Sequence, residues 1–385
     1  MNPFTFNTPG SIVFGAGKLA DLGVLATGRM SGPVLLITDP GLVETGIAVR
    51  ATNMLAAAGL SVSVFPDVMA DPPESVVQAA TDAARAAGAT GVVGVGGGSS
   101  LDVAKLVAVL ATGQEKLADM YGVGNTQGPR LPLILVPTTA GTGAEVTMVS
   151  IVTTGTSEKI GVVSPWLLPD VALLDPELTY GLPSHITAAT GIDAMVHAIE
   201  AYASASPNNN PLSRALACEA LRCLGAAVET AVHDGGNQAA RADMLLGSML
   251  AGQAFANSPV AAVHALAYPI GGYFKVPHGL SNALVLPHVL RFNCVTHPGA
   301  YAELAPITFP ELEGIKGQEA AAAFVDELAR LSQHCGLQQH LRDVGIREDD
   351  IPMMARAAMN QTRLLQNNPR QMDETAARSI YRAAF

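Results

Sequence analysis

Cysteines, charged residues and long apolar runs are all scarce in this chain, and each scarcity excludes a class of protein. The 385 residues contain no CxxC pair and only four cysteines, Cys218, Cys223, Cys294 and Cys335. This pattern predicts reduced thiols and excludes a disulfide framework or a zinc-thiolate knuckle. No apolar run approaches the roughly 20 residues that cross a bilayer. The first ten residues also lack the basic and apolar blocks of a secretion signal, so we expect a cytoplasmic protein.

Basic residues are few as well. Lysine and arginine together number 22 against 33 aspartates and glutamates, which gives a net charge of -11. Nucleic acid and anionic membranes would repel such a surface, so a small molecule is the expected partner. Hydrophobic residues make up 49% of the chain and charged residues 14%, a composition typical of a well-packed enzyme and unlike that of a disordered protein.

Strand patterns and helix patterns alternate up to about residue 180. We predict strands at 11–14, 33–38, 61–65, 91–95 and 131–136, separated by helices at 42–58, 73–87 and 99–111. This alternation is typical of βαβ units with a mostly parallel sheet. Alanine-rich helical patterns then dominate, and we predict helices at 186–204, 211–232, 238–256, 281–290, 317–335 and 347–361. The chain is therefore predicted to form an α/β nucleotide-binding domain over 1–182 and an all-helical domain over 183–385.

A glycine triplet follows the predicted strand 91–95. The chain reads Gly96-Gly97-Gly98-Ser99 before the next predicted helix begins. Glycines let the backbone approach a phosphate closely, and a helix N-terminus offers unpaired N–H groups with a partial positive charge. The alternative is a tight turn without a ligand. We interpret the loop as a pyrophosphate site, although it matches neither the Walker pattern nor the usual dinucleotide fingerprint.

Two further loops follow predicted strands of the same domain. Asp39 follows strand 33–38, where a carboxylate can accept hydrogen bonds from a ribose and would repel a 2′-phosphate. This interpretation favours NAD over NADP, but an aspartate before Pro40 can also simply begin a turn. The loop from Pro137 to Thr147 is rich in threonine and glycine, which suits contacts with a nucleotide at the carboxyl edge of a sheet.

Asp193 and His197 lie four residues apart in the predicted helix 186–204, so their side chains share one face. Taken alone, this pair is explained better by a solvated helix face or by an internal Asp-His ion pair than by a metal site. Two more histidines, His264 and His278, follow in an apolar segment rich in glycine and proline, where a lone charge would be costly. One carboxylate and three imidazoles suit Fe(II) or Zn(II) better than calcium or magnesium.

The remaining histidines and one glutamate have weaker patterns. Glu200 continues the stripe of Asp193 and His197 by three residues, and it either orients a ligand or makes a packing contact. His288 lies in an apolar setting and is predicted to be a core residue. The histidines in polar settings are predicted to be surface residues, namely His185, His233, His297, His334 and His340.

With these motifs in order along nearly its full length, the sequence resembles the iron-containing (group III) alcohol dehydrogenases. The resemblance rests on the glycine triplet through Lys105, on Pro137 through Glu145, on Gly191 through His197, and on His264 through His278. It implies a Rossmann-like N-terminal domain, a helical C-terminal domain, and a metal and NAD that meet between them. The implied activity is hydride transfer between NAD(H) and a small alcohol, a primary alcohol, diol or hydroxyacid, with its aldehyde or ketone.

The resemblance also implies roles for individual residues. The implied metal ligands are Asp193, His197, His264 and His278. The implied cofactor-binding residues are Asp39, Gly96, Gly97, Gly98, Ser99, Asp102, Thr138, Thr139, Thr142, Thr147 and Lys159. Phe255 is expected near the substrate, and Lys159 and Tyr268 close to the chemistry.

Tyr268 is a departure from the family pattern. Many members have a histidine four residues after the third metal ligand, where it is thought to relay the proton, and this chain has Tyr268. A phenol has a reference pKa near 10 and is a poorer base at neutral pH than an imidazole near 6.5. The departure leaves the metal site intact and changes the expected proton path.

Three alternatives remain open from the sequence. Within the oxidoreductases, a glycerol dehydrogenase or a hydroxyacid-oxoacid transhydrogenase would use the same residues. A dehydroquinate synthase is similar in architecture, but it needs basic side chains for a phosphorylated and carboxylated substrate, and Lys275 is the nearest one to the metal motifs. A nucleotide-binding subunit without activity is the third. We expect a homo-oligomer, such as a homodimer, because the N-terminal strand is predicted to be an exposed edge.

Overall fold

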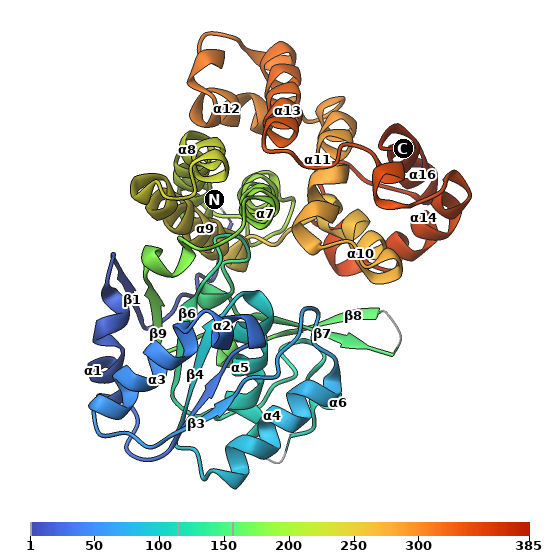
Figure 1. The fold of residues 1–385 in the computed structure, drawn as a ribbon. Coiled ribbons are helices and arrows are strands. Elements are labelled where there is room, and N and C mark those ends of the chain that lie inside the picture. Colours follow the sequence, from blue (N-terminus) through green and yellow to red (C-terminus); the bar gives the residue numbers. More distant parts are fainter. Residues whose placement is uncertain (1, 114, 156–157) are drawn as a thin grey trace. The chain divides into compact units, whose positions relative to one another are not determined.

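The computed structural model describes every residue except Met1, Gln114, Thr156 and Ser157. The chain forms two compact units (Figure 1). The unit called here the α/β unit comprises Asn7–Thr139 and Gly143–Tyr180, and the helical unit comprises Met1–Phe6, Ala140–Thr142 and Gly181–Phe385. Three residues of the predicted threonine and glycine loop, Ala140–Thr142, therefore pack with the helices, while their neighbours on both sides belong to the α/β unit.

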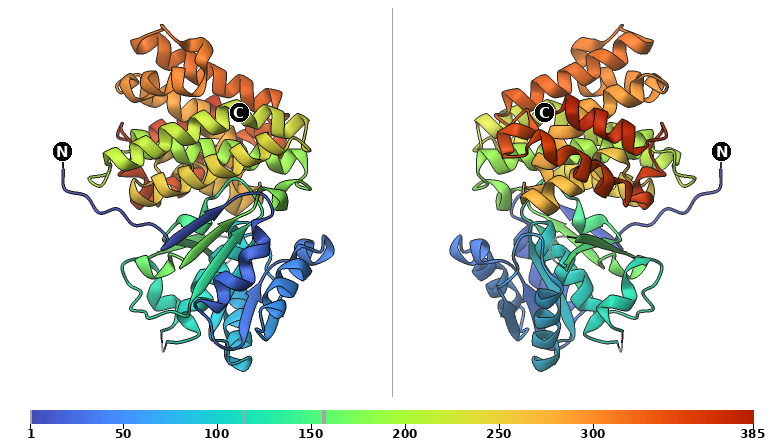
Figure 2. Two further views of the ribbon diagram at one scale, coloured as in Figure 1. Left: turned by 90° about the vertical axis from the view of Figure 1, so that its left-hand side faces the viewer. Right: turned by 90° about the vertical axis from the view of Figure 1, so that its right-hand side faces the viewer.

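The α/β unit is built on a parallel sheet, which is drawn with its surrounding helices in Figures 1 and 2. Its six strands lie in the order β1-β9-β6-β4-β2-β3. The strands are β1 (Ser11–Phe14), β2 (Val34–Ile37), β3 (Val62–Phe65), β4 (Gly91–Gly96), β6 (Leu133–Pro137) and β9 (Val171–Leu174). Strands β2, β4, β6 and β9 are buried at every residue, as expected for a parallel sheet covered on both faces. The predicted α/β fold is confirmed.

Helices cover both faces of this sheet because successive strand residues point to opposite sides. On one face Val34 and Leu36 pack with α1 (Leu22–Thr27) and α3 (Ile47–Ala57). On the other, Leu35 and Ile37 pack with α4 (Glu74–Ala86) and α5 (Gly98–Leu110). The predicted helix 42–58 is wrong as a single element. It breaks into α2 (Pro40–Glu44) and α3 at Gly46, whose φ of 79° lies in the left-handed region that glycine tolerates.

The structure adds a second, smaller sheet and strand β9, which the sequence analysis did not predict. The small sheet has the order β5-β8-β7, with β5 (Gly122–Val123), β7 (Val149–Thr154) and β8 (Glu158–Val163). Strands β7 and β8 are antiparallel. These strands were not predicted because their threonines and charged residues interrupt the apolar pattern of a buried strand. In β7 the buried residues alternate with partly exposed ones, so polar side chains are tolerated. The helix α6 (Leu117–Met120) precedes this sheet.

The helical unit contains ten α-helices among the residues that the structure describes. They are α7 (Ser184–Ala203), α8 (Pro211–His233), α9 (Gln238–Asn257), α10 (Ala262–Phe274), α11 (His278–Cys294), α12 (Pro298–Thr308), α13 (Gly317–His334), α14 (Ile351–Met359), α15 (Thr362–Leu365) and α16 (Glu374–Ala383). All six predicted helices are present. No described helix is both long enough and apolar enough to cross a membrane.

The sequence analysis assigned no secondary structure to the segment with His264 and His278, which is rich in glycine and proline. In the structure His264 lies in α10 and His278 is the first residue of α11. Pro269 and Pro287 sit inside these two helices. Proline costs an internal hydrogen bond, and here the burial of the apolar residues around each proline outweighs that cost.

Candidate metal centre

Helix α7 carries the stripe of Asp193, His197 and Glu200 through the core of the helical unit. The three residues are only 2%, 5% and 5% exposed, and every residue from Gly191 to Tyr202 is buried. A solvated face therefore does not explain the stripe. Buried ionisable groups are costly unless they find partners, so the stripe needs partners from neighbouring helices.

Those partners come from α10 and α11. His264 is 3% exposed, and the His278 side chain is 30% exposed. One ligand atom from each of Asp193, His197, His264 and His278 lies within 4.8 Å of all the others. Gly279 allows this approach, because a Cβ at that position would collide with the Ala189 carbonyl of α7. The structure thus brings together the four residues that the sequence analysis grouped.

Two of the imidazoles are oriented by hydrogen bonds on their far side. The Nδ1 of His264 lies 2.7 Å from Glu200 Oε2, and the same carboxylate accepts the backbone N–H groups of Ala261 and Val263. The Nδ1 of His197 lies 3.2 Å from the Gly141 carbonyl oxygen. Because both acceptors require a proton on Nδ1, the Nε2 atoms of these imidazoles keep their lone pairs for a cation.

The protonation states also suit a cation. Burial alone would raise the pKa of Asp193, but His197, His278, His264 and the amide of Asn282 together hold it below its ordinary value. Burial lowers the pKa of His197 to about 4, against the opposing pull of Asp193. A metal site needs an ionised carboxylate and neutral imidazoles. The donor set therefore fits a divalent metal such as iron or zinc in residue type, spacing and charge.

Two aromatic rings adjoin the cluster. Phe255, on α9, stacks on His197 with the ring centroids 4.4 Å apart. Tyr268 lies one helical turn after His264 on α10, and its ring centroid is 6.1 Å from that of His278. Phe255, expected near the substrate, and Tyr268, which occupies the position of the family's relay histidine, thus lie next to the candidate ligands.

The other histidines lie away from the cluster. The five predicted surface histidines, His185, His233, His297, His334 and His340, are all exposed. His288 is half-buried, and burial lowers its pKa to about 4. The four cysteines are free thiols, as predicted.

The sequence analysis missed two groups that touch the ligands and left a third undecided. Gly141 and Asn282 received no role, and Glu200 was left between two interpretations. Helical spacing offered a clue for Asn282, because it lies four residues after His278 on α11. No sequence pattern identifies Gly141, which is 56 residues from His197 along the chain.

Gly141 generates a testable prediction. A Cβ at this position would lie 2.7 Å from Thr190 Cβ, so Gly141→Ala must shift the carbonyl that holds His197. We expect a metal affinity about 10–100-fold weaker, the usual cost of losing such a contact, measured by competition with a chelator. The matched control is Gly181→Ala, because a Cβ at Gly181 meets nothing within 4 Å. Equal metal affinity in the two variants would contradict the role of Gly141.

In the α/β unit, the glycine triplet has the geometry of a close turn into α5. Gly96 has φ 155°, and a Cβ there would lie 2.6 Å from Ser100 Cβ, so glycine is required. Helix α5 begins at Gly98, and its N-cap, Gly97, supplies no side-chain hydrogen bond. The first N–H groups of a 13-residue helix therefore lack a side-chain cap, which suits an anion.

Asp39 already has partners at the end of β2. Its Oδ1 accepts the N–H of Leu42 and so caps α2, and its Oδ2 lies 3.4 Å from the Ser100 hydroxyl. The turn-initiating interpretation of Asp39 is therefore correct. A carboxylate can accept several hydrogen bonds, so a contact with a ribose is compatible with this geometry.

Three other predicted cofactor residues, Asp102, Thr147 and Lys159, already have partners within the α/β unit. The Nζ of Lys105 is fully buried and donates to Asp102, to the Thr147 hydroxyl and to the Val149 carbonyl. The second oxygen of Asp102 accepts the N–H of Ile151 at 3.0 Å. Asp102 and Thr147 thus tie α5 to β7. Lys159 forms an ion pair of 2.6 Å with Asp71, whose φ of 53° is unusual for a residue other than glycine.

The loop residues differ in their surroundings. Thr138 is buried, with its backbone N–H bonded to the Gly96 carbonyl, and Ser99 and Thr139 are half-buried. Thr142 belongs to the helical unit. None of these positions reveals a nucleotide contact by itself, so their roles stay predictions.

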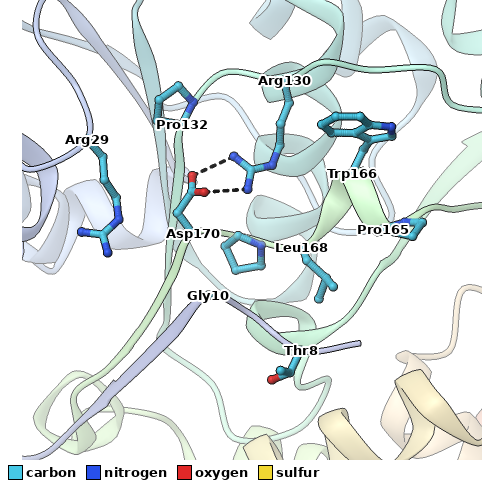
Figure 3. A pocket seen from close by; sticks show the side chains of 10 residues that line it. Thr8, Gly10, Arg29, Arg130, Pro132, Pro165, Trp166, Leu168 and Asp170 are labelled. Carbon is cyan, nitrogen blue, oxygen red and sulfur yellow. Dashed lines mark hydrogen bonds and ion pairs between the residues drawn. The ribbon is translucent and has the colours of Figure 1, made fainter. Parts of the chain in front are cut away.

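A surface cavity of about 670 Å³ lies at the edge of the sheet opposite the glycine triplet, beside the amino ends of β1, β6 and β9. Figure 3 shows the Arg130 guanidinium between the Trp166 ring and the Asp170 carboxylate, to which it forms a bidentate ion pair. The Arg130 contact, together with the Leu133 N–H, lowers the pKa of Asp170 although burial opposes the shift. The carboxyl edge with the glycine loop is separate from this cavity.

The buried carboxyl group of Glu145, near Lys105, generates a second prediction, which concerns the pH dependence of stability. It is 2% exposed, its Oε1 has no hydrogen-bond partner among the described residues, and burial raises its pKa from 4.5 to about 7. Between pH 4.5 and about pH 7 the Glu145 carboxyl group is ionised in the unfolded chain but still protonated in the folded chain. The free energy of unfolding therefore falls as pH rises through this range. We expect a loss on the order of 3 kcal/mol, complete above about pH 7.

Glu145→Gln should remove this loss, so that the variant gains stability over the wild type from pH 5 to pH 8. The measurement is urea unfolding followed by fluorescence of Trp166, the single tryptophan, which lies in the α/β unit. Glu44→Gln removes an exposed glutamate of the same unit and controls for net charge. Parallel pH profiles of wild type and Glu145→Gln would contradict the assignment.

Comparison with known proteins agrees with this site. Residues 9–176 match the family described as iron-containing alcohol dehydrogenase, and residues 187–385 match the C-terminal part of the Fe-containing alcohol dehydrogenase family. The chain is 41% identical to long-chain-alcohol dehydrogenase 1 of Geobacillus thermodenitrificans, over 91% of this chain and 89% of that protein. It is 36% identical to 1,3-propanediol dehydrogenase of Citrobacter freundii, over 99% of both chains.

A solved structure of a 1,3-propanediol oxidoreductase superposes with a TM-score of 0.95 at 36% identity, covering 100% of both chains. The likeness extends to both the α/β and the helical units. Together with the family matches, it shows that this chain belongs to the iron-containing alcohol dehydrogenase family and is an oxidoreductase that interconverts small alcohols and their aldehydes.

Proposed function

We propose that this dehydrogenase depends on one divalent cation held by Asp193, His197, His264 and His278. The observation that carries the proposal is the convergence of their four ligand atoms within 4.8 Å of one another. Fe(II) is the proposed native metal, in line with the family, and Zn(II) suits the same donors. When bound, the cation supplies Lewis acidity toward an alcohol or carbonyl oxygen, while nicotinamide exchanges the hydride.

The residues of the chain prepare this chemistry. Glu200 and the Gly141 carbonyl hold His264 and His197 with the proton on Nδ1, so that each Nε2 is an unprotonated acceptor. Phe255 covers one face of the His197 ring, which excludes water from that side and offers an apolar surface to a substrate chain. His278 is the most exposed of the four candidate ligands, and 30% of its side chain is accessible.

NAD is the proposed cofactor, with the glycine triplet and the N-terminus of α5 holding its pyrophosphate. The required glycine at 96 and the uncapped start of α5 support this assignment. Asp39, beside that loop through Ser100, favours NAD over NADP, because a 2′-phosphate would meet its negative charge. Ser99, Thr138, Thr139, Thr142 and Lys159 are proposed to complete the cofactor site, and Asp102 and Thr147 to support it through Lys105.

The proposed substrate is a small primary alcohol or diol. The relatives reported above act, by their names, on long-chain alcohols and on 1,3-propanediol. The apolar ring of Phe255 next to His197 is compatible with both. The dehydroquinate synthase alternative loses support, because the family matches cover both halves of the chain. We also propose a homodimer, since β1 is an edge strand that pairs with β9 alone among the strands that the structure describes, and a cytoplasmic location.

The decisive experiment removes single ligands. His264→Ala and His278→Ala should each lose bound metal and lower turnover by at least about 100-fold, since a Lewis acid contributes several kcal/mol. Turnover is measured without oxygen as oxidation of NADH by a panel of aldehydes and ketoacids, with metal content determined on the same preparation. The exposed His297→Ala is the control. Full activity of metal-stripped wild type would overturn the proposal.

Tyr268 is the proposed proton-carrying group of this chain, because it lies beside His278 where many relatives have histidine. Tyr268→His should move the pH optimum of alcohol oxidation to lower pH, by up to about 3 units, the difference between the reference pKa values of phenol and imidazole. Tyr273→His, an exposed tyrosine of the same helix, should leave the optimum unchanged. An unchanged profile for Tyr268→His would place this ring outside the proton path.

A further inference from the structure

Asn282 lies against the candidate ligands although it does not belong to the set. It is fully buried on α11, one helical turn after His278, and therefore on the same face of the helix. Its Nδ2 lies 2.6 Å from Asp193 Oδ1, 3.3 Å from His264 Nε2 and 3.4 Å from His278 Nε2. One amide group thus contacts three of the four candidate ligands.

The chemistry of an amide fixes its orientation here. Nδ2 carries two hydrogens and accepts nothing, whereas Oδ1 only accepts. If the amide were reversed, Oδ1 would face the Asp193 carboxylate at 2.6 Å with no hydrogen between the two oxygens. The observed orientation therefore places the donors on the ligand atoms. It also agrees with Glu200, which accepts a hydrogen bond from Nδ1–H of His264 and so leaves Nε2 as an acceptor.

The other end of the same amide has no partner. Oδ1 of Asn282 is buried and makes no hydrogen bond to any described residue. Asn293, on the same helix, shows the contrasting arrangement, because its amide donates to Tyr301 and Asn368 and also accepts from Asn368. A buried polar atom without a partner is costly and calls for an explanation. An asparagine with a purely structural role would be satisfied at both ends, as Asn293 is.

We propose that Asn282 is a positioning residue for the metal centre. Its amide holds Asp193 through Oδ1, which leaves the second carboxylate oxygen for the cation. Its Nδ2 also lies within 3.4 Å of Nε2 of His264 and His278, so the amide keeps these two imidazoles beside the carboxylate. This inference rests on the proposed function, because it assumes that Asp193 and the histidines are ligands.

The test uses Co(II) as the probe, added to metal-free protein without oxygen, with affinity measured by competition with a chelator. Asn282→Ala and the similarly sized but apolar Asn282→Leu should each bind Co(II) about 10–100-fold more weakly than the wild type. The visible absorption bands of the bound Co(II) should also change, because the carboxylate ligand is no longer held in place.

The matched control is Asn293→Ala, which removes a buried amide from the same helix away from the ligands. It should keep the affinity and the Co(II) spectrum of the wild type even where its thermal stability falls. Two variants at position 282 are used so that a folding defect in one does not decide the result.

The outcomes separate this inference from the function on which it rests. Wild-type protein that binds no Co(II) would overturn the proposed metal site itself. Wild-type binding with equal affinity in both Asn282 variants would overturn only the role of Asn282. Tighter binding in those variants would do the same, because it would show that the amide competes with the cation.

Discussion

The buried carboxylate of Asp193 is the constraint on which the helical unit depends. It sits in the middle of an apolar helix at 2% exposure, yet its pKa is held below its ordinary value. An ionised group survives such burial only where donors and positive charge surround it. Helices α10 and α11 supply three of the surrounding groups, and the close contact at Gly279 brings α11 near enough to α7.

Around this carboxylate, the ligands are held by groups that ordinary motif reading overlooks. Glu200 accepts hydrogen bonds from His264 and from two backbone N–H groups at the start of α10, so it orients the imidazole and the start of its helix together. Gly141 binds His197 from a loop whose flanking residues belong to the α/β unit. A backbone carbonyl of the loop expected to contact NAD thus makes a hydrogen bond to His197, a candidate metal ligand.

The α/β unit solves a similar problem of buried charge differently. Lys105 is fully buried, and its hydrogen bonds to Thr147 and to the Val149 carbonyl tie the helix after the glycine triplet to the start of β7. Asp102 and Thr147, first assigned to the cofactor, accept from this lysine. We therefore propose that they support the loops, while the glycine backbone and the start of α5 bind the phosphates of the cofactor.

The sequence by itself determined the alternating strands and helices of the sheet, the long helices α7, α8, α9 and α13, and the grouping of Asp193 with three histidines. These features depend on local periodicity or on residue type, which are visible in one dimension. Only the tertiary structure decided that His264 and His278 lie on helices despite nearby prolines, and that β5, β7, β8 and β9 are strands. It also revealed Gly141, Glu200 and Asn282 as partners of the ligands. Such contacts join residues up to 89 positions apart, and their identity follows from packing between helices that no local pattern encodes.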